Sequence, residues 1–503
     1  MRGRVAADHV TFSGIPYAAS PVGERRWAPP ERPQPWRGVR DATAPASACA
    51  QHGYDDAGES IVVGQEDCLY LNVTVPRGAQ SPGRRPVMVW LHGGGFDSGS
   101  SSQYGAAPLA IGGDVVVVTV NYRLGALGFL SSPALDGEGH PSGNYGLEDQ
   151  AAALRWVRRN AARFGGDPDN VTLFGQSGGA RSVCAHLASP RSRGLFHKAI
   201  MQSGPCATAL VDKPVADERG AQATAELGCV PSDDDTASAG GAVTACLRSR
   251  PVASILDTLA EQGGALMGEY RDQPWMPVVG TPLLPRQPGE ALADGAAAGM
   301  PLLVGTNRDE MSAFVGRSYD AAGRPLTEPA YRALVEDGFG RDAAAILARY
   351  PAADHPSPAV ALTTLLTDWG GNVAGACSTL RTAELTARHS RVFAYELAED
   401  SGLAPRGFPF GAFHGWELAF LWDLSAADFG YPPLTAEQQA LSRQMVAYWT
   451  SFARTGDPNG PGSPRWAALS PGAGVVQSLA AGDGGIAPAP FAAENQCDFW
   501  LGQ

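Results

Sequence analysis

The chain lacks long apolar runs, a basic excess and internal repeats. Its purely apolar stretches, such as Val115–Val118, are far shorter than the roughly 18–20 residues of a membrane span. Met1–Val10 contains arginines but no apolar core of the kind found in a signal peptide. The net charge of 38 − 51, or −13, disfavours nucleic acids and anionic membranes, whose phosphates attract Lys and Arg. We expect no membrane span and no nucleic-acid partner.

Metal-binding patterns are also missing. None of the eight cysteines stands in Cys-x-x-Cys spacing or beside a histidine, so we expect no zinc site, and we expect no cofactor. The spacing of the cysteines does not by itself choose among their possible pairings. The plainest interpretation is eight reduced, mostly buried thiols, as in an intracellular enzyme.

The 503 residues are 44% hydrophobic, which is enough for a large core, and short apolar runs alternate with helical patterns. Runs expected as buried strands are Val87–Leu91, Val115–Val120, Val171–Phe174, Ala199–Gln202, Leu302–Val304 and Val392–Leu397. Expected helices are Leu147–Phe164, Gly178–Ala188 and Glu437–Ala453. This alternation predicts an α/β fold, with a large, mostly parallel central sheet covered by helices on both faces.

The strongest local signal is the GQSGG segment at 175–179, between an expected strand and an expected helix. A G-x-S-x-G in that context is typical of a nucleophile elbow, in which a tight turn exposes the serine hydroxyl. The following helix directs backbone N–H groups towards a developing oxyanion. In a glycine-rich chain the motif can also arise by chance, but its context favours Ser177 as a nucleophile.

A second signal is the HGGGF segment at 92–96, after the expected strand Val87–Leu91. Consecutive glycines cost conformational entropy unless backbone must approach something closely. In α/β-hydrolases such a segment supplies oxyanion-hole N–H groups. On its own this segment fits a simple glycine-rich turn. The two segments together, each after an expected strand, indicate a serine hydrolase much more specifically than either one does.

A serine nucleophile needs a base and an acid, which follow it in the order acid, then histidine. His355 and His389 lie in polar surroundings, whereas His414 lies in a loop of small residues between a strand and an apolar run. We therefore expect His414 to be the base. Asp309 and Glu310 both follow the strand Leu302–Val304, and the residues alone leave either as the acid. The expected chemistry is acyl transfer through a covalent acyl-enzyme.

These motifs are part of a longer pattern. The chain resembles the type-B carboxylesterase/cholinesterase family, including bacterial para-nitrobenzyl-type esterases. The matching segments are FSGIPYA at 12–18, EDCLYLNV at 66–73, NYR at 121–123, GLEDQAAALRWV at 146–157 and FGGDPDNVTLFGQS at 164–177. The resemblance implies a single α/β-hydrolase domain over 1–503, with helical insertions around 208–298 and 318–390.

The resemblance also assigns roles to individual residues. It implies that Glu310 is the triad acid, and that the oxyanion hole is formed by Gly94, Gly95 and Gly178. Ser203 is similar to a buried serine near the family's triad, although a serine that caps a strand end fits equally well.

Disulfides are a further implication of the resemblance. It implies the pairs Cys49–Cys68, Cys229–Cys246 and Cys377–Cys497, and leaves Cys184 and Cys206 free. Two or three bridges indicate an oxidising compartment. We expect a secreted protein whose signal peptide is not in this sequence, with a cytoplasmic location as the alternative.

Two departures from the family pattern concern substrate choice. Gln176 stands where the family's GESAGG segment has a glutamate, and the loop between Cys49 and Cys68 has no tryptophan with which to stack a quaternary ammonium. We expect a serine carboxylesterase for neutral, small-molecule esters, present as a monomer or weak oligomer. The alternatives are a lipase, thioesterase or amidase with the same triad, or a binding protein without catalysis, although members of that kind lack a triad residue.

Overall fold

A mixed sheet forms the centre of the molecule. The computed structural model describes residues 1–55, 58–78, 83–230, 239–259, 273–369, 371, 374–424 and 429–502. Within them the sheet has 12 strands in the order β18-β17-β15-β14-β11-β10-β7-β9-β6-β2-β1-β3. The strands are β1 (Arg2–Val5), β2 (His9–Pro16), β3 (Asp41–Ala42), β6 (Tyr70–Pro76), β7 (Arg85–Leu91), β9 (Val116–Val120), β10 (Gly166–Gln176), β11 (Lys198–Gln202), β14 (Leu302–Asn307), β15 (Val392–Leu397), β17 (Val476–Leu479) and β18 (Ala487–Ala489).

The predicted parallel arrangement is confirmed for the middle of the sheet. From β9 through β7, β10, β11, β14 and β15 to β17, every neighbouring pair is parallel. Antiparallel pairs join β2, β6 and β9 on one side and β17 to β18 on the other. Because parallel strands end at the same edge, the segments that follow β10, β14 and β15 are brought together there.

Helices cover both faces of the sheet, as predicted. Along β7, Val87, Val89 and Leu91 pack on one face, while Met88 and Trp90 pack on the other, because successive side chains of a strand alternate. The first face is covered by α4 (Tyr145–Asn160), α5 (Gly178–Ala188) and α15 (Ala376–Ala387). The second face is covered by α1 (Ala107–Gly113) and α17 (Ala436–Thr455).

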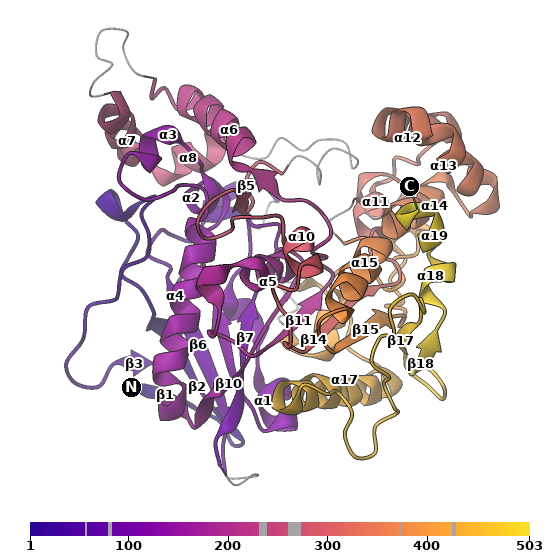
Figure 1. Ribbon diagram of the computed structural model, residues 1–503, viewed down its shortest axis with the longest axis horizontal. Helices are drawn as coiled ribbons and strands as arrows, with labels where there is room; N and C mark the ends of the chain where they lie inside the picture. The colour runs from indigo at the N-terminus through magenta and orange to yellow at the C-terminus, as the bar shows by residue number, and fades with distance from the viewer. Residues whose placement is uncertain are drawn as a thin grey trace.

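Two groups of helices lie beyond one end of the sheet, on opposite sides (Figure 1). One group contains α3 (Pro133–Asp136), α6 (Lys213–Glu226), α7 (Ala239–Ser249) and α8 (Val252–Thr258). The other contains α12 (Glu328–Phe339), α13 (Ala343–Arg349) and α14 (Pro358–Asp368). Most of these helices fall in the ranges 208–298 and 318–390, of which 231–238, 260–272, 370 and 372–373 lie outside the described residues.

All eight cysteines are paired. Three disulfides join the pairs that the family resemblance implied: Cys49–Cys68, Cys229–Cys246 and Cys377–Cys497.

The expectation that Cys184 and Cys206 are free was wrong, because a fourth disulfide joins them. Cys184 lies on α5 and Cys206 follows β11, and the packing of α5 on this strand leaves the two Cα atoms 5.3 Å apart. That separation suits a disulfide. Among the described helices, none is both long and apolar enough to cross a membrane.

Candidate active site

Ser177 lies at the sharp turn between β10 and α5. Its backbone has φ 55° and ψ −123°, outside the regions that L-residues ordinarily adopt, and its N–H donates to the carbonyl of Gln202 at 2.9 Å. Glycines make this turn possible. A Cβ on Gly175 would lie 2.5 Å from the backbone of Gly179, and one on Gly179 would lie 2.0 Å from the carbonyl oxygen of Leu91. The turn has the shape of the predicted elbow.

The glycine-rich segment that follows β7 packs against this turn. Gly94 and Gly95 have φ values of 104° and 64°, which glycine adopts readily. A Cβ on Gly178 would lie 3.3 Å from the backbone nitrogen of Gly95 and 3.2 Å from that of Phe96. A Cβ on Gly93 would lie 3.2 Å from the Cβ of Ser177. The structure therefore brings Gly94, Gly95 and Gly178 beside Ser177.

His414 and Glu310 form a close hydrogen-bonded pair. The Nδ1 of His414 lies 2.5 Å from Oε2 of Glu310, which is fully buried. The other oxygen of Glu310 accepts hydrogen bonds from the backbone N–H of Asn307 and the hydroxyl of Thr306, both at 2.7 Å. A carboxylate opposite Nδ1 places the proton there and leaves a lone pair on Nε2.

The surroundings of His414 shift its pKa. Burial lowers the pKa of His414, but the charge of Glu310 and its hydrogen bond outweigh this effect, so the pKa is raised above its usual value. The arrangement suits an imidazole that gains a proton at Nε2 while Glu310 stabilises the positive charge.

Asp309, the other candidate acid, faces a different group. Its Oδ2 accepts the backbone N–H of Ala412 at 2.8 Å, and its own N–H donates to the carbonyl of Ala412 at 3.0 Å. Asp309 therefore anchors the loop that carries His414 but does not contact the imidazole. Arg308 pairs with Glu396 at 3.1 Å.

The side chain of Gln176 contacts the second ring nitrogen of His414, the one that does not face Glu310. Its Nε2 lies 3.1 Å from Nε2 of His414. Within the described part of the chain, no hydrogen bond joins Ser177 to this nitrogen. In the structure the lone pair of His414 is thus directed at Gln176.

A buried polar group that the sequence analysis missed lies behind the His414–Glu310 pair. Glu417 is fully buried and accepts a hydrogen bond from the side chain of Asn307 at 2.7 Å. Burial, with the charge of Glu310, raises the pKa of Glu417 to about 7. An acidic residue inside the apolar segment WELAFLW was the signal that could have identified it.

Ser203 lies next to Gln202, at the end of β11. It has a φ of 53°, and its N–H donates to the carbonyl of Gly305 at 2.8 Å. Its hydroxyl is buried and has no hydrogen-bond partner among the described residues. No group of three or more potential metal ligands occurs in the described ranges.

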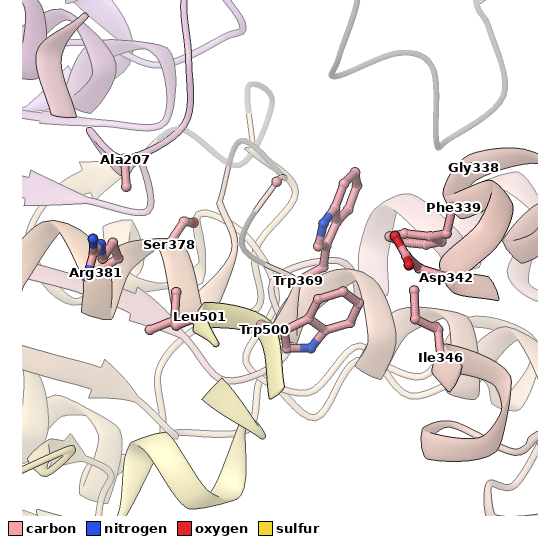
Figure 2. A pocket seen from close by; sticks show the side chains of 11 residues that line it. Ala207, Gly338, Phe339, Asp342, Ile346, Trp369, Ser378, Arg381, Trp500 and Leu501 are labelled. Atoms are coloured by element: carbon pink, nitrogen blue, oxygen red, sulfur yellow. The ribbon is translucent and has the colours of Figure 1, made fainter. Parts of the chain in front are cut away.

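A separate cavity of about 550 Å³ lies away from these residues. Figure 2 shows Arg381 and Ser378 at one end of it and Phe339 and Asp342 at the other. Ser177, Glu310 and His414 do not line this cavity, so it is not part of the candidate site.

The sheet, the serine turn and the histidine loop together define an α/β-hydrolase. The model of the Carboxylesterase family matches residues 2–500. The chain belongs to this family and is a carboxylic ester hydrolase.

Individual relatives agree with this assignment. The chain is 35% identical over 486 residues to the pyrethroid hydrolase Ces2e of Rattus norvegicus, covering 91% of this chain and 80% of the relative. It is 36% identical over 482 residues to an acylcarnitine hydrolase of Mus musculus, covering 91% and 81%. A solved PNB esterase superposes with a TM-score of 0.79 at 32% identity, covering 98% of this chain and 97% of the other.

Proposed function

We propose that the protein hydrolyses neutral carboxylic esters through a Ser177–His414–Glu310 triad and an acyl-enzyme. The observation that carries the proposal is the 2.5 Å contact between His414 and Glu310, on the sheet edge where Ser177 also lies. The chemistry needs a base whose Nε2 is unprotonated, and the carboxylate at Nδ1 favours that tautomer. We assign the role of acid to Glu310 because Asp309 is turned towards Ala412.

The reaction proceeds in two acyl transfers. Nε2 of His414 takes the proton of Ser177 as Oγ forms a bond to the ester carbon, and the π electrons move onto the carbonyl oxygen. Backbone N–H groups of Gly94, Gly95 and Gly178 stabilise that oxyanion, and losing one such donor typically costs about 3 kcal/mol. The oxyanion then re-forms the carbonyl, the bond from the acyl carbon to the alkoxy oxygen breaks, and Nε2–H of His414 gives its proton to that oxygen. Water repeats the sequence on the acyl-enzyme, which releases the acid and restores Ser177.

Replacement of the nucleophile tests this function. Ser177→Ala should lower kcat for nitrophenyl esters by roughly 10⁴-fold or more, since the triad acts as a unit. An organophosphonate should label wild-type Ser177 stoichiometrically and leave the variant unlabelled. Labelling of another residue with full loss of activity would refute the assignment. A series of esters of graded acyl length then separates an esterase from a lipase, because a lipase gains activity at its substrate's solubility limit.

We further propose one α/β-hydrolase domain over 1–503, in a monomer or weak oligomer, with the helices of 208–298 and 318–390 as insertions. We also propose secretion, which the four disulfides support because such bonds persist in oxidising compartments. Protein isolated from its native host should then show no titratable thiol after denaturation. Eight free thiols would instead indicate a cytoplasmic enzyme.

A further inference from the structure

The side chain of Gln176 contacts Nε2 of His414, the atom that acts as the base in the proposed mechanism. Gln176 is 4% exposed, at the end of β10, and directly precedes Ser177. Because Nδ1 of His414 carries the proton that faces Glu310, the contact at Nε2 must be an N–H of the Gln176 amide that donates to the lone pair. The single lone pair of Nε2 cannot accept fully from Gln176 and Ser177 at once.

The side-chain amide of Gln176 has room to rotate so that Oε1 instead of Nε2 faces His414. Its Oε1 lies next to Gly93, and a Cβ on residue 93 would be only 2.5 Å from this oxygen. The absence of a side chain on Gly93 therefore leaves space for the amide. Among the residues that the structure describes, none donates a hydrogen bond to this oxygen. Half a turn about the terminal torsion exchanges Oε1 and Nε2, and such torsions are broad and roughly two-fold.

We propose that Gln176 is a positioning residue for His414, acting as an uncharged partner for both protonation states of the imidazole. Its amide N–H donates to Nε2 of the neutral ring. It withdraws when the Ser177 hydroxyl donates there, and its carbonyl oxygen accepts from Nε2–H of the imidazolium after the proton has moved. This inference rests on the proposed triad.

The absence of charge at position 176 has a consequence for pH dependence. Among the described residues, the titratable groups around His414 are Glu310 and Glu417, with Asp309 on the neighbouring loop and Tyr431, whose hydroxyl donates to Gly415 at 3.1 Å. All are acids, and the ionised ones already favour the imidazolium. A further carboxylate at 176 would hold a proton on Nε2, whereas the amide leaves the base available at lower pH.

The isosteric change Gln176→Glu tests this role. The acidic limb of a kcat/KM profile reports the pKa of the free enzyme's base, and a carboxylate within 4 Å of an imidazole raises that pKa by about one to three units. We expect the limb of Gln176→Glu to move up by at least one pH unit, so that activity at pH 6 falls about tenfold or more and recovers at higher pH. The same change at the exposed Gln222 of α6 should leave the limb within about 0.2 units.

Gln176→Met separates positioning from charge. It keeps the length but removes both hydrogen-bonding groups, so we expect roughly tenfold lower kcat/KM on the plateau with the limb within about 0.3 units of wild type. Rates are expressed per Ser177 titrated by the organophosphonate, which corrects for misfolded protein. A limb unchanged in Gln176→Glu, or a wild-type plateau in Gln176→Met, would overturn the inference. Failure of Ser177 to titrate in the wild type would overturn the proposed function instead.

Discussion

At the scale of single residues, two adjacent carboxylates of the site have different partners. Glu310 pairs with His414, and Asp309 holds the backbone of Ala412. Adjacent side chains point in different directions, so one residue can support the charge of the imidazole while its neighbour supports the loop that carries it.

Amide replacements should distinguish these two roles. Glu310→Gln removes the charge that stabilises the imidazolium and the tautomer that leaves Nε2 free, so kcat should fall by roughly 10²–10⁴-fold. Asp309→Asn retains an oxygen that can accept from Ala412, so its loss should be within about fivefold. Nitrophenyl acetate turnover per titrated Ser177 measures both. Equal or reversed losses would assign the acid to Asp309.

Asp368, at the end of α14, should make stability depend on pH. It is 2% exposed, accepts the hydroxyl of Tyr350 at 2.8 Å, and burial raises its pKa to about 7. In the unfolded chain the pKa is about 3.9, so between about pH 4 and 7 the folded state binds more protons than the unfolded state. The free energy of unfolding contributed by this group therefore falls as pH rises through that window.

Asp368→Asn should remove this part of the pH dependence. The amide stays neutral and can still accept from Tyr350. Between pH 5 and 8 we expect the variant to lose roughly 1–3 kcal/mol less unfolding free energy than the wild type. Urea unfolding at the two pH values measures the difference, and Glu417, which titrates in both proteins, cancels from it. Identical losses would mean that Asp368 is already ionised when buried.

At the scale of elements, the fourth disulfide joins the helix that follows the nucleophile to the segment after the neighbouring strand. Cys184 is on α5, and Cys206, after β11, donates its N–H to Thr382 on α15 at 2.9 Å. Gly204 packs on the same turn, since a Cβ there would lie 2.6 Å from the carbonyl oxygen of Ser177. The disulfide links α5 to the segment after β11, and the hydrogen bond to Thr382 links that segment to α15, so the three elements are held together around the turn of Ser177.

Removing this disulfide should cost stability. The cysteines are 22 residues apart, and a loop of that size corresponds to about 3 kcal/mol in the chain-entropy model. We expect Cys184→Ala/Cys206→Ala to lose about 2–4 kcal/mol of unfolding free energy with six cysteines still paired. Peptide mapping without reduction should find Cys184 linked to Cys206 in the wild type. Two reactive thiols at these positions would restore the expectation from the sequence.

At the scale of the whole molecule, the charge of −13 attracts cations, but salt screens that attraction beyond about 10 Å at 0.1 M. Selectivity must therefore come from contacts near Ser177, where Gln176 is uncharged. A desolvated cation–π contact would give about 1–2 kcal/mol, and the loop from Cys49 to Cys68 has no tryptophan to supply one.

A choline ester should accordingly be no better a substrate than its neutral 3,3-dimethylbutyl counterpart. The comparison is of kcat/KM at matched acyl group and salt, and we expect the two values to agree within about tenfold. A larger preference for the choline ester would reveal a cation site. Its first candidate is Asp97, whose carboxyl oxygen lies 3.4 Å from the position of a Cβ on Gly95, and Asp97→Asn would then abolish the preference.

Local patterns in the sequence were enough to predict the α/β class, the six adjacent strands β9, β7, β10, β11, β14 and β15, and the covering helices α4, α5 and α17. The run Val392–Leu397 is β15 and the run Gly178–Ala188 is α5, because apolar periodicity and glycine punctuation act within a few residues. The roles of Ser177 as nucleophile and His414 as base were predicted in the same way, from small-residue turns at strand ends, and they stay predictions. The prediction that Glu310 rather than Asp309 is the acid needed the family resemblance, because a local sequence pattern does not distinguish two adjacent carboxylates.

Only the tertiary structure decided which side chains face each other across the sheet edge. It joined Cys184 to Cys206, placed Glu417 behind Asn307 and turned Gln176 onto His414. These contacts span from 22 to 238 residues of chain, and each depends on how α5, β11 and the His414 loop pack together. The sequence specifies such contacts only through the packing of the whole core. The direction in which a side chain points depends on the neighbours that pack around it, and these come from distant parts of the chain.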